Sequence, residues 1–162
     1  MKKNYYKIIG LIIALTCITS VNAKTLVKLK INHKMGDMAY AKNTQSTNNL
    51  GQNYDINRLE YYVSNIIVGH DGGALDTIKN KILLINPSGS FETYTLDSLN
   101  FTTIEFIQFS IGVDPIYNHS NPTGYAPGHP LAPKSPTMHW GWTAGYRFVA
   151  IEGKSGTSMT NP

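Results

Sequence analysis

Three histidines stand ten residues apart toward the end of the 162-residue chain: His119, His129 and His139. The last of them opens the segment "HWGW", in which Trp140 and Trp142 follow it. Imidazoles among aromatic and thioether side chains, with no thiolate nearby, suit copper better than magnesium or calcium. A ten-residue spacing is not a ligand motif, however, and a single histidine is more often an ordinary core or surface residue.

The aromatic segment around His139 also has a purely structural interpretation. Alternate side chains of a strand share one face. Here that face would consist of Met138, Trp140, Trp142, Tyr146 and Phe148. Such a face is typical of a β-sandwich core, where aromatic side chains bury much apolar surface. His139 would then point the other way, so a site that combines it with an indole requires a bulge or a strand end.

Motifs of the common enzyme classes are missing from the sequence. It has no G-x-S-x-G nucleophile motif, no Walker A loop, no HExxH and no EF-hand loop. The only cysteine is Cys17, near the N-terminus, so the rest of the chain has neither a disulfide nor a thiolate ligand. We therefore expect a protein that is not an enzyme, and whose metal, if it binds one, is held without cysteine.

Residues 1–23 have the pattern of a secretory signal peptide. Lysines at the start are followed by an apolar run from Ile8 to Ile18 and by the small residue Ala23. The run is too short for a confident membrane span, and Thr16 before Cys17 disfavours a lipid anchor. We therefore expect a periplasmic or secreted protein with no stable membrane span once it is mature.

Removal of residues 1–23 takes away three lysines and lowers the net charge from +4 to +1. No basic stripe remains to bind nucleic acid. Residues 24–162 are enough for one domain with a core of its own.

Short strands separated by turn signals predict the fold. The segments "TLVKLKINH", "RLEYYVSNIIVGH", "KILLIN", "FETYTL" and "TIEFIQFSIGVD" are β-branched, aromatic or alternating. Residues 41–53 are polar and predict a loop, and residues 114–137 hold six of the eight prolines and predict a long functional loop rather than a strand. We expect an all-β, antiparallel, Greek-key-like β-sandwich. Because the sequence stops in "KSGTSMTNP" without a closing strand, we expect the domain to be incomplete at its C-terminus.

Three segments in order, "RLEYYVSNIIV", "FSIGVDPIYNHSNP" and "MHWGWTAGYRFVAIEG", resemble the MbnP-like family of exported copper-binding proteins, which is related to MopE/CorA. The resemblance implies that a tryptophan is oxidised to kynurenine and binds copper, as Cu(I) or Cu(II), together with histidines. It also implies a di-haem peroxidase-like partner that makes the modification. Opening the indole would expose an aryl amine, which is a nitrogen donor that tryptophan itself lacks.

Carried onto this chain, the resemblance assigns His33 and His139 as copper ligands, Trp140 or Trp142 as the oxidised residue, and His129 as a reserve ligand. It predicts a role in copper uptake, storage or homeostasis. Two ligands of one copper must bring their nitrogens within about 4 Å of each other. The alternative is a metal-free β-sandwich interaction module, which binds a protein or glycan through the proline-rich loop.

Overall fold

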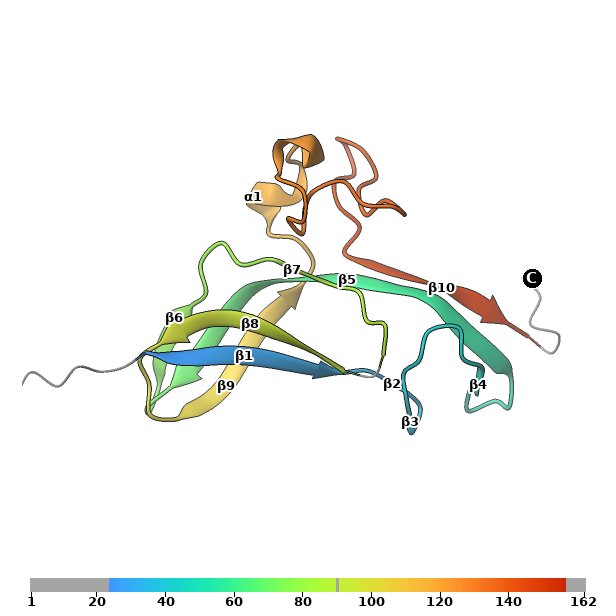
Figure 1. Ribbon diagram of the computed structural model, residues 1–162, viewed down its shortest axis with the longest axis horizontal. Coiled ribbons are helices and arrows are strands. Elements are labelled where there is room, and N and C mark those ends of the chain that lie inside the picture. Colours follow the sequence, from blue (N-terminus) through green and yellow to red (C-terminus); the bar gives the residue numbers. More distant parts are fainter. Residues whose placement is uncertain (1–23, 90, 157–162) are drawn as a thin grey trace, which may run out of the picture.

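A computed structural model describes residues 24–89 and 91–156 of the chain, so the predicted signal peptide lies outside the described residues. The described part is built from antiparallel strands in two layers (Figure 1). One layer is a six-stranded sheet and the other is the pair β1 (Thr25–Asn32) and β8 (Phe91–Leu99). The predicted fold class, an all-β antiparallel sandwich, is confirmed.

The larger sheet is organised around one long strand, β5 (Asn53–His70). Its β-branched and aromatic residues favour an extended backbone, and a register shift near Asn65, which has φ 51°, divides it into two halves. Five strands pair with it: β4 (Ser46–Thr47), β6 (Ala74–Thr77), β7 (Leu83–Ile85), β9 (Ile104–Ile111) and β10 (Val149–Ser155). A small hairpin of β2 (Lys34–Met35) and β3 (Met38–Ala39) follows β1.

The core has two parts, one on each face of β5. Val63, Ile66 and Val68 pack with Val27 of β1 and Leu96 of β8 between the two layers. The neighbouring Tyr62 belongs to a second cluster with Val113, Leu131, Met138, Tyr146 and Ala150. Successive side chains of a strand point to opposite faces. Tyr62 and Val63 therefore mark the two sides of the sheet.

The segment from 112 to 148 covers the second face and lies above β5 in Figure 1. It contains a single helical turn, α1 (Pro115–Asn118), and a 3-10 turn at Pro122–Gly124. Asp114 caps the first turn, because its Oδ1 accepts from the Ile116 N–H at 3.1 Å. The proline-rich residues 114–137 contain no strand, as predicted.

The aromatic segment is not the strand that its alternation predicts. β10 begins only at Val149, and residues 138–148 form a turn-rich loop with one isolated bridge between His139 and Tyr146. Gly141 and Gly145 have φ values of 97° and 74°, far from the negative φ of a regular β-strand. Met138 and Tyr146 are buried as expected, whereas Trp140 and Trp142 are 67% and 62% exposed. The interpretation of both indoles as core is therefore wrong.

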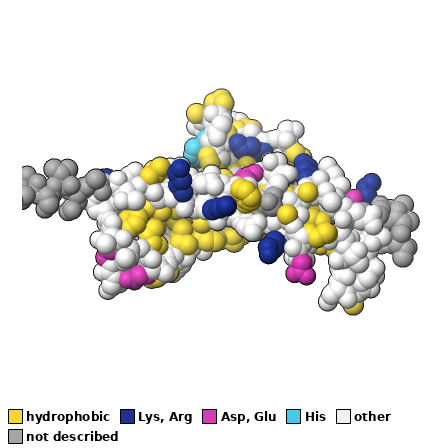
Figure 2. Space-filling model, turned by 60° about the horizontal axis from the view of Figure 1, so that its bottom comes forward, with side chains coloured by type: hydrophobic (Ala, Val, Ile, Leu, Met, Phe, Trp, Pro, Cys, Tyr) yellow, Lys and Arg dark blue, Asp and Glu magenta, His cyan; other side chains and the backbone are white. Residues whose placement is uncertain are grey.

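The smaller layer covers only part of the larger sheet. Ile107, Phe109 and Ile111 of β9, with Val149 and Ile151 of β10, stay exposed, and Figure 2 shows apolar side chains gathered on the face that this layer leaves open. Among the described residues, no helix is long and apolar enough to cross a membrane.

Candidate functional site

A closed turn holds the segment from Met138 to Arg147. The Trp140 N–H donates to the Gly145 carbonyl at 2.8 Å, and the Gly145 N–H donates to the Gly141 carbonyl at 2.8 Å. The Arg147 N–H donates to the Met138 carbonyl at 2.9 Å, which closes the base of the turn. These bonds hold the segment as a turn directly before β10. A turn at this place is what lets His139 and an indole take part in one site.

His139 lies against two aromatic rings in this turn. Its ring centroid is 4.8 Å from that of Tyr146 and 6.2 Å from that of Trp142, in both cases edge to face. Its Nδ1 accepts from the Gly141 N–H at 3.1 Å, and its buried Nε2 has no hydrogen-bond partner among the described residues. Since a backbone N–H can only donate, Nδ1 of neutral His139 is unprotonated here and Nε2 carries the proton.

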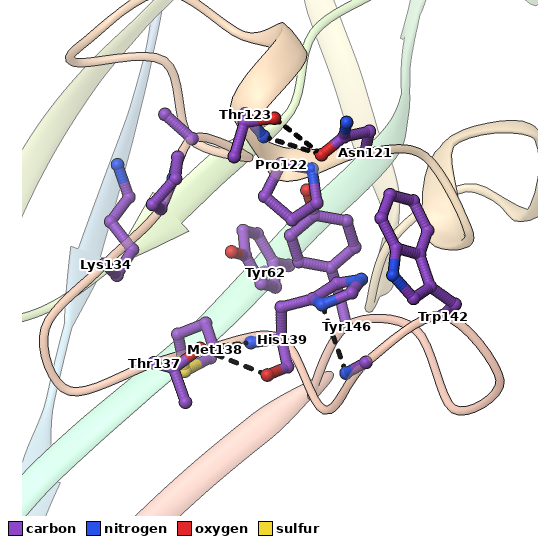
Figure 3. A pocket seen from close by; sticks show the side chains of 13 residues that line it. Tyr62, Asn121, Pro122, Thr123, Lys134, Thr137, Met138, His139, Trp142 and Tyr146 are labelled. Carbon is purple, nitrogen blue, oxygen red and sulfur yellow. Dashed lines mark hydrogen bonds between the residues drawn. The ribbon is translucent and has the colours of Figure 1, made fainter.

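A cavity of about 290 Å³ opens beside this turn. Its walls include Tyr62, Asn121, Lys134, Met138, His139 and Trp142. Figure 3 shows His139, Trp142 and Tyr146 grouped at one end of it, with Lys134 at the other side in this view. The cavity therefore combines one imidazole and one indole with a mostly apolar wall.

The tyrosines of the cavity stay neutral. Burial, reinforced by Tyr146 and Glu60, raises the pKa of Tyr62, and burial is also the main reason that the pKa of Tyr146 is raised. Their hydroxyls donate to the carbonyls of Pro130 at 3.2 Å and of Leu131 at 2.6 Å. Both phenols are thus structural hydrogen-bond donors rather than anionic ligands.

The two tryptophans have different surroundings. The guanidinium carbon of Arg147 lies 4.7 Å from the centre of the Trp140 ring, which is a cation–π contact. Trp142 instead contacts the His139 ring. A cation stands over Trp140, so Trp142 is the indole better placed to be part of a metal site.

His33 lies on the other side of β5. Its Nε2 is 2.8 Å from the Tyr61 hydroxyl, and its ring also contacts Tyr40. Tyr61 precedes Tyr62 in β5 and points to the opposite face, whereas His139 and Tyr62 line the same cavity. The structure therefore does not bring His33 and His139 together. Their assignment as copper ligands stays a prediction.

His129 is separate from both. Its ring stacks on Tyr125, with centroids 4.4 Å apart and an interplanar angle of 8°, and its Nδ1 accepts from the Leu131 N–H at 3.1 Å. Burial lowers the pKa of His129, and the nearby ammonium of Lys134 lowers it further. Neutral His129 is thus favoured, with its proton on Nε2.

This environment predicts how His129 titrates. Its pKa, followed by NMR, is expected to lie below the ordinary value of about 6.5, and Lys134→Gln is expected to raise it because one source of repulsion is removed. Lys154→Gln, a change on β10, serves as the control and should leave it unchanged. Because the folded pKa is lowered, the contribution of His129 to stability is present above the unfolded pKa and is lost as the pH falls through the folded value. An unchanged pKa of His129 in Lys134→Gln would contradict the conclusion that the Lys134 ammonium lowers this pKa.

His119 is the residue that the sequence left unassigned and the structure places beside Trp142. Its Nδ1 is 3.0 Å from the Trp142 carbonyl, 23 residues away. The ten-residue spacing draws attention to His119, but nothing local in the sequence predicts this contact.

A buried ion pair anchors the segment that leads to His139. Arg58 of β5 donates to Glu60 from Nε and Nη2, at 2.9 and 2.7 Å, and to Glu152 of β10 from Nη1 at 2.6 Å. Burial would lower the pKa of Arg58, but the two carboxylates together raise it. Nη2 also reaches the Thr137 carbonyl at 3.2 Å and the Met138 sulfur at 3.3 Å. Arg58 thus ties the loop to the sheet directly before His139.

Residues 24–89 and 91–156 contain no cluster of three or more His, Cys, Asp or Glu side chains that could hold a metal ion.

The fold and the loop together define an antiparallel β-sandwich with an imidazole and indole site on one face. The MbnP family model matches residues 24–161, so the chain belongs to the MbnP family. The solved structure of MbnP from Methylosinus trichosporium has a similar fold, with a TM-score of 0.62 and 17% sequence identity. The match covers 81% of this chain and 55% of that chain. The comparison with curated proteins finds no match.

Proposed function

We propose that this protein is an exported copper-binding protein that serves copper uptake, storage or homeostasis. The observation that carries the proposal is the edge contact between His139 and Trp142 beside the cavity, in a chain of the MbnP family. The proposed role is binding rather than catalysis, and the proposed location is the periplasm or the cell exterior.

The donor set fits a soft metal only after two changes. Neutral His139 presents a protonated Nε2 in this conformation, so binding through that atom requires the proton to leave and the hydrogen bond from Gly141 to break. One hydrogen bond is worth only about 1 kcal/mol net, which is small beside a metal–imidazole bond. The second change is oxidation of the indole, because tryptophan offers a donor N–H and no lone pair.

We assign the oxidised residue to Trp142. It contacts His139, whereas Trp140 lies under the Arg147 guanidinium. When bound, copper would be held by the His139 imidazole and the aryl amine of the kynurenine made from Trp142, in a partly apolar setting that favours Cu(I). His33 and His129 are not adjacent to this pair and are the weaker candidates.

The modification requires a partner that reaches the indole. Trp142 is 62% exposed, which leaves it accessible to a di-haem peroxidase-like protein. This accessibility is the structural basis for proposing such a partner.

The test is intact mass and metal analysis of protein purified from its native compartment. A kynurenine adds about 4 Da, since one carbon is exchanged for one oxygen, and we expect peptide mapping to place it at Trp142. We expect bound copper to be lost in His139→Ala and kept in His129→Ala, which is the matched control. An unmodified mass and no copper, even after exposure to Cu(I), would overturn the proposal.

The metal-free interaction module is the second candidate, and the exposure of Trp140 and of Trp142, which lines the cavity, favours it. It predicts that a protein or glycan binds the unmodified chain in the absence of copper. Replacement of either tryptophan by alanine would then weaken that binding, while chelators of copper would have no effect.

A further inference from the structure

His119 stands at the C-terminal end of α1, and its side chain is exposed. It has two described contacts. Its Nδ1 is 3.0 Å from the carbonyl oxygen of Trp142, and its Nε2 is 3.5 Å from the side-chain amide nitrogen of Asn118.

The first contact fixes the tautomer of neutral His119. A carbonyl oxygen can only accept, so Nδ1 must carry the proton and donate it. Nε2 then carries a lone pair that can accept a hydrogen bond or bind a metal. Binding of a metal through Nε2 requires this tautomer. In metal-bound histidines the other ring nitrogen usually donates a hydrogen bond to a carbonyl or carboxylate, as Nδ1 of His119 does here.

The second contact agrees with the first. The oxygen of the Asn118 amide accepts from the Tyr146 N–H at 3.0 Å, so the orientation of the amide is set independently of His119. Its NH₂ group therefore faces Nε2 of His119. At 3.5 Å this contact is at the limit of a hydrogen bond. An amide donor facing Nε2 is compatible only with an unprotonated nitrogen there.

The other histidines differ in this respect. His129 and His139 each accept a backbone N–H at Nδ1, so their Nε2 atoms carry protons. His70 lies between two carboxylates, with Nδ1 at 3.2 Å from Asp71 and Nε2 at 3.3 Å from Asp76. The Tyr61 hydroxyl beside His33 can donate or accept and does not fix the tautomer.

We propose that His119 is a copper ligand of this protein through Nε2, held in the binding tautomer by the Trp142 carbonyl. The inference rests on the proposed function, and it extends that function to a histidine outside the sequence-predicted ligand set. Trp142 is then touched from two sides, at its ring by His139 and at its backbone by His119.

The first test needs no copper. Long-range ¹H–¹⁵N NMR correlation on the metal-free protein above pH 7 distinguishes the two neutral tautomers of each histidine. We expect His119 to be protonated on Nδ1, and His129 and His139 on Nε2. A His119 protonated on Nε2 would overturn the inference and leave the proposed function standing.

The second test separates ligation from mere positioning. In His119→Asn the side-chain amide nitrogen takes the place of Nδ1, so the bond to the Trp142 carbonyl can persist while Nε2 is lost. We expect its Cu(I) affinity, measured by competition with a chromophoric chelator on kynurenine-containing protein, to fall by more than tenfold, because loss of even an outer partner of a metal ligand costs about 10–100-fold. His70→Asn, at the C-terminal end of β5 and outside every proposed ligand set, is the matched control and should bind as the wild type does.

Each result has one meaning. Equal Cu(I) affinity of His119→Asn and wild type would show that His119 only positions Trp142, and the inference would fail alone. A wild type that binds no Cu(I) would overturn the proposed function as well. A Cu(I)-dependent shift of the His119 Nε2 resonance in the wild type would support ligation even if the variant were partly misfolded.

Discussion

Arg58→Met is expected to lower the free energy of unfolding by about 3–5 kcal/mol, the usual cost of removing one member of a buried ion pair. The side chains of Arg58 and Glu60 are both 8% exposed. Without the guanidinium, the Glu60 carboxylate keeps only the Asn86 amide at 2.9 Å as a described hydrogen-bond donor. A buried carboxylate with so little compensation is strongly destabilising. Denaturant titration monitored by circular dichroism measures the loss.

The double variant Arg58→Met with Glu60→Gln is the control for this explanation. It removes both charges, so it should be more stable than Arg58→Met alone even though it carries one more substitution. Glu152 is 51% exposed and can be solvated, so it needs no compensation. If the double variant is less stable than the single one, the buried charge is not the cause of the loss.

The longer strands were predictable because their signals are local, whereas the short β4 (Ser46–Thr47) lies in the segment 41–53 that was predicted to be a loop. Residues 25–32 alternate at period two, and residues 58–70 are rich in β-branched and aromatic side chains. The proline-rich segment was predictable for the opposite reason, since proline cannot donate to a strand ladder. These signals need no knowledge of the distant chain.

The segment 138–148 carries the same alternation and is nevertheless a loop. Its side chains share the face pattern of a strand, but Gly141 and Gly145 adopt positive φ and turn the chain back on itself. A glycine in a sequence permits this conformation without requiring it. Side-chain periodicity therefore could not separate the two outcomes.

The candidate site depended on contacts that join distant residues. The sequence found His139 and Trp142, which are neighbours in the chain. It could not find the hydrogen bond between His119 and the Trp142 carbonyl, whose residues are 23 apart in the chain. It could not find the bond from Arg58 to Glu152 either, whose residues are 94 apart. Nor could it tell that β5 separates His33 from His139, because that follows from the pairing of strands in the sheet.

Gly145→Ala is expected to be destabilising by about 2–5 kcal/mol, as the sum of two costs. A residue with a Cβ in the left-handed region costs roughly 1–2 kcal/mol, and Gly145 has φ 74°. The new Cβ would also lie 2.5 Å from the Asn118 carbonyl oxygen and 2.7 Å from its amide nitrogen. Relieving such an overlap costs about 1–3 kcal/mol.

Gly141→Ala separates the two costs, because Gly141 also has a positive φ of 97° but open space where its Cβ would stand. Denaturant unfolding should show a smaller loss for Gly141→Ala than for Gly145→Ala. The overlap at Gly145 has a further consequence, since Asn118 must move and its bonds to Tyr146 and His119 are then disturbed. Gly145→Ala should therefore shift the His119 ring resonances in the metal-free protein. Equal losses in the two variants, with unchanged His119 resonances, would mean that the close contact between Asn118 and Gly145 does not contribute to the cost of Gly145→Ala.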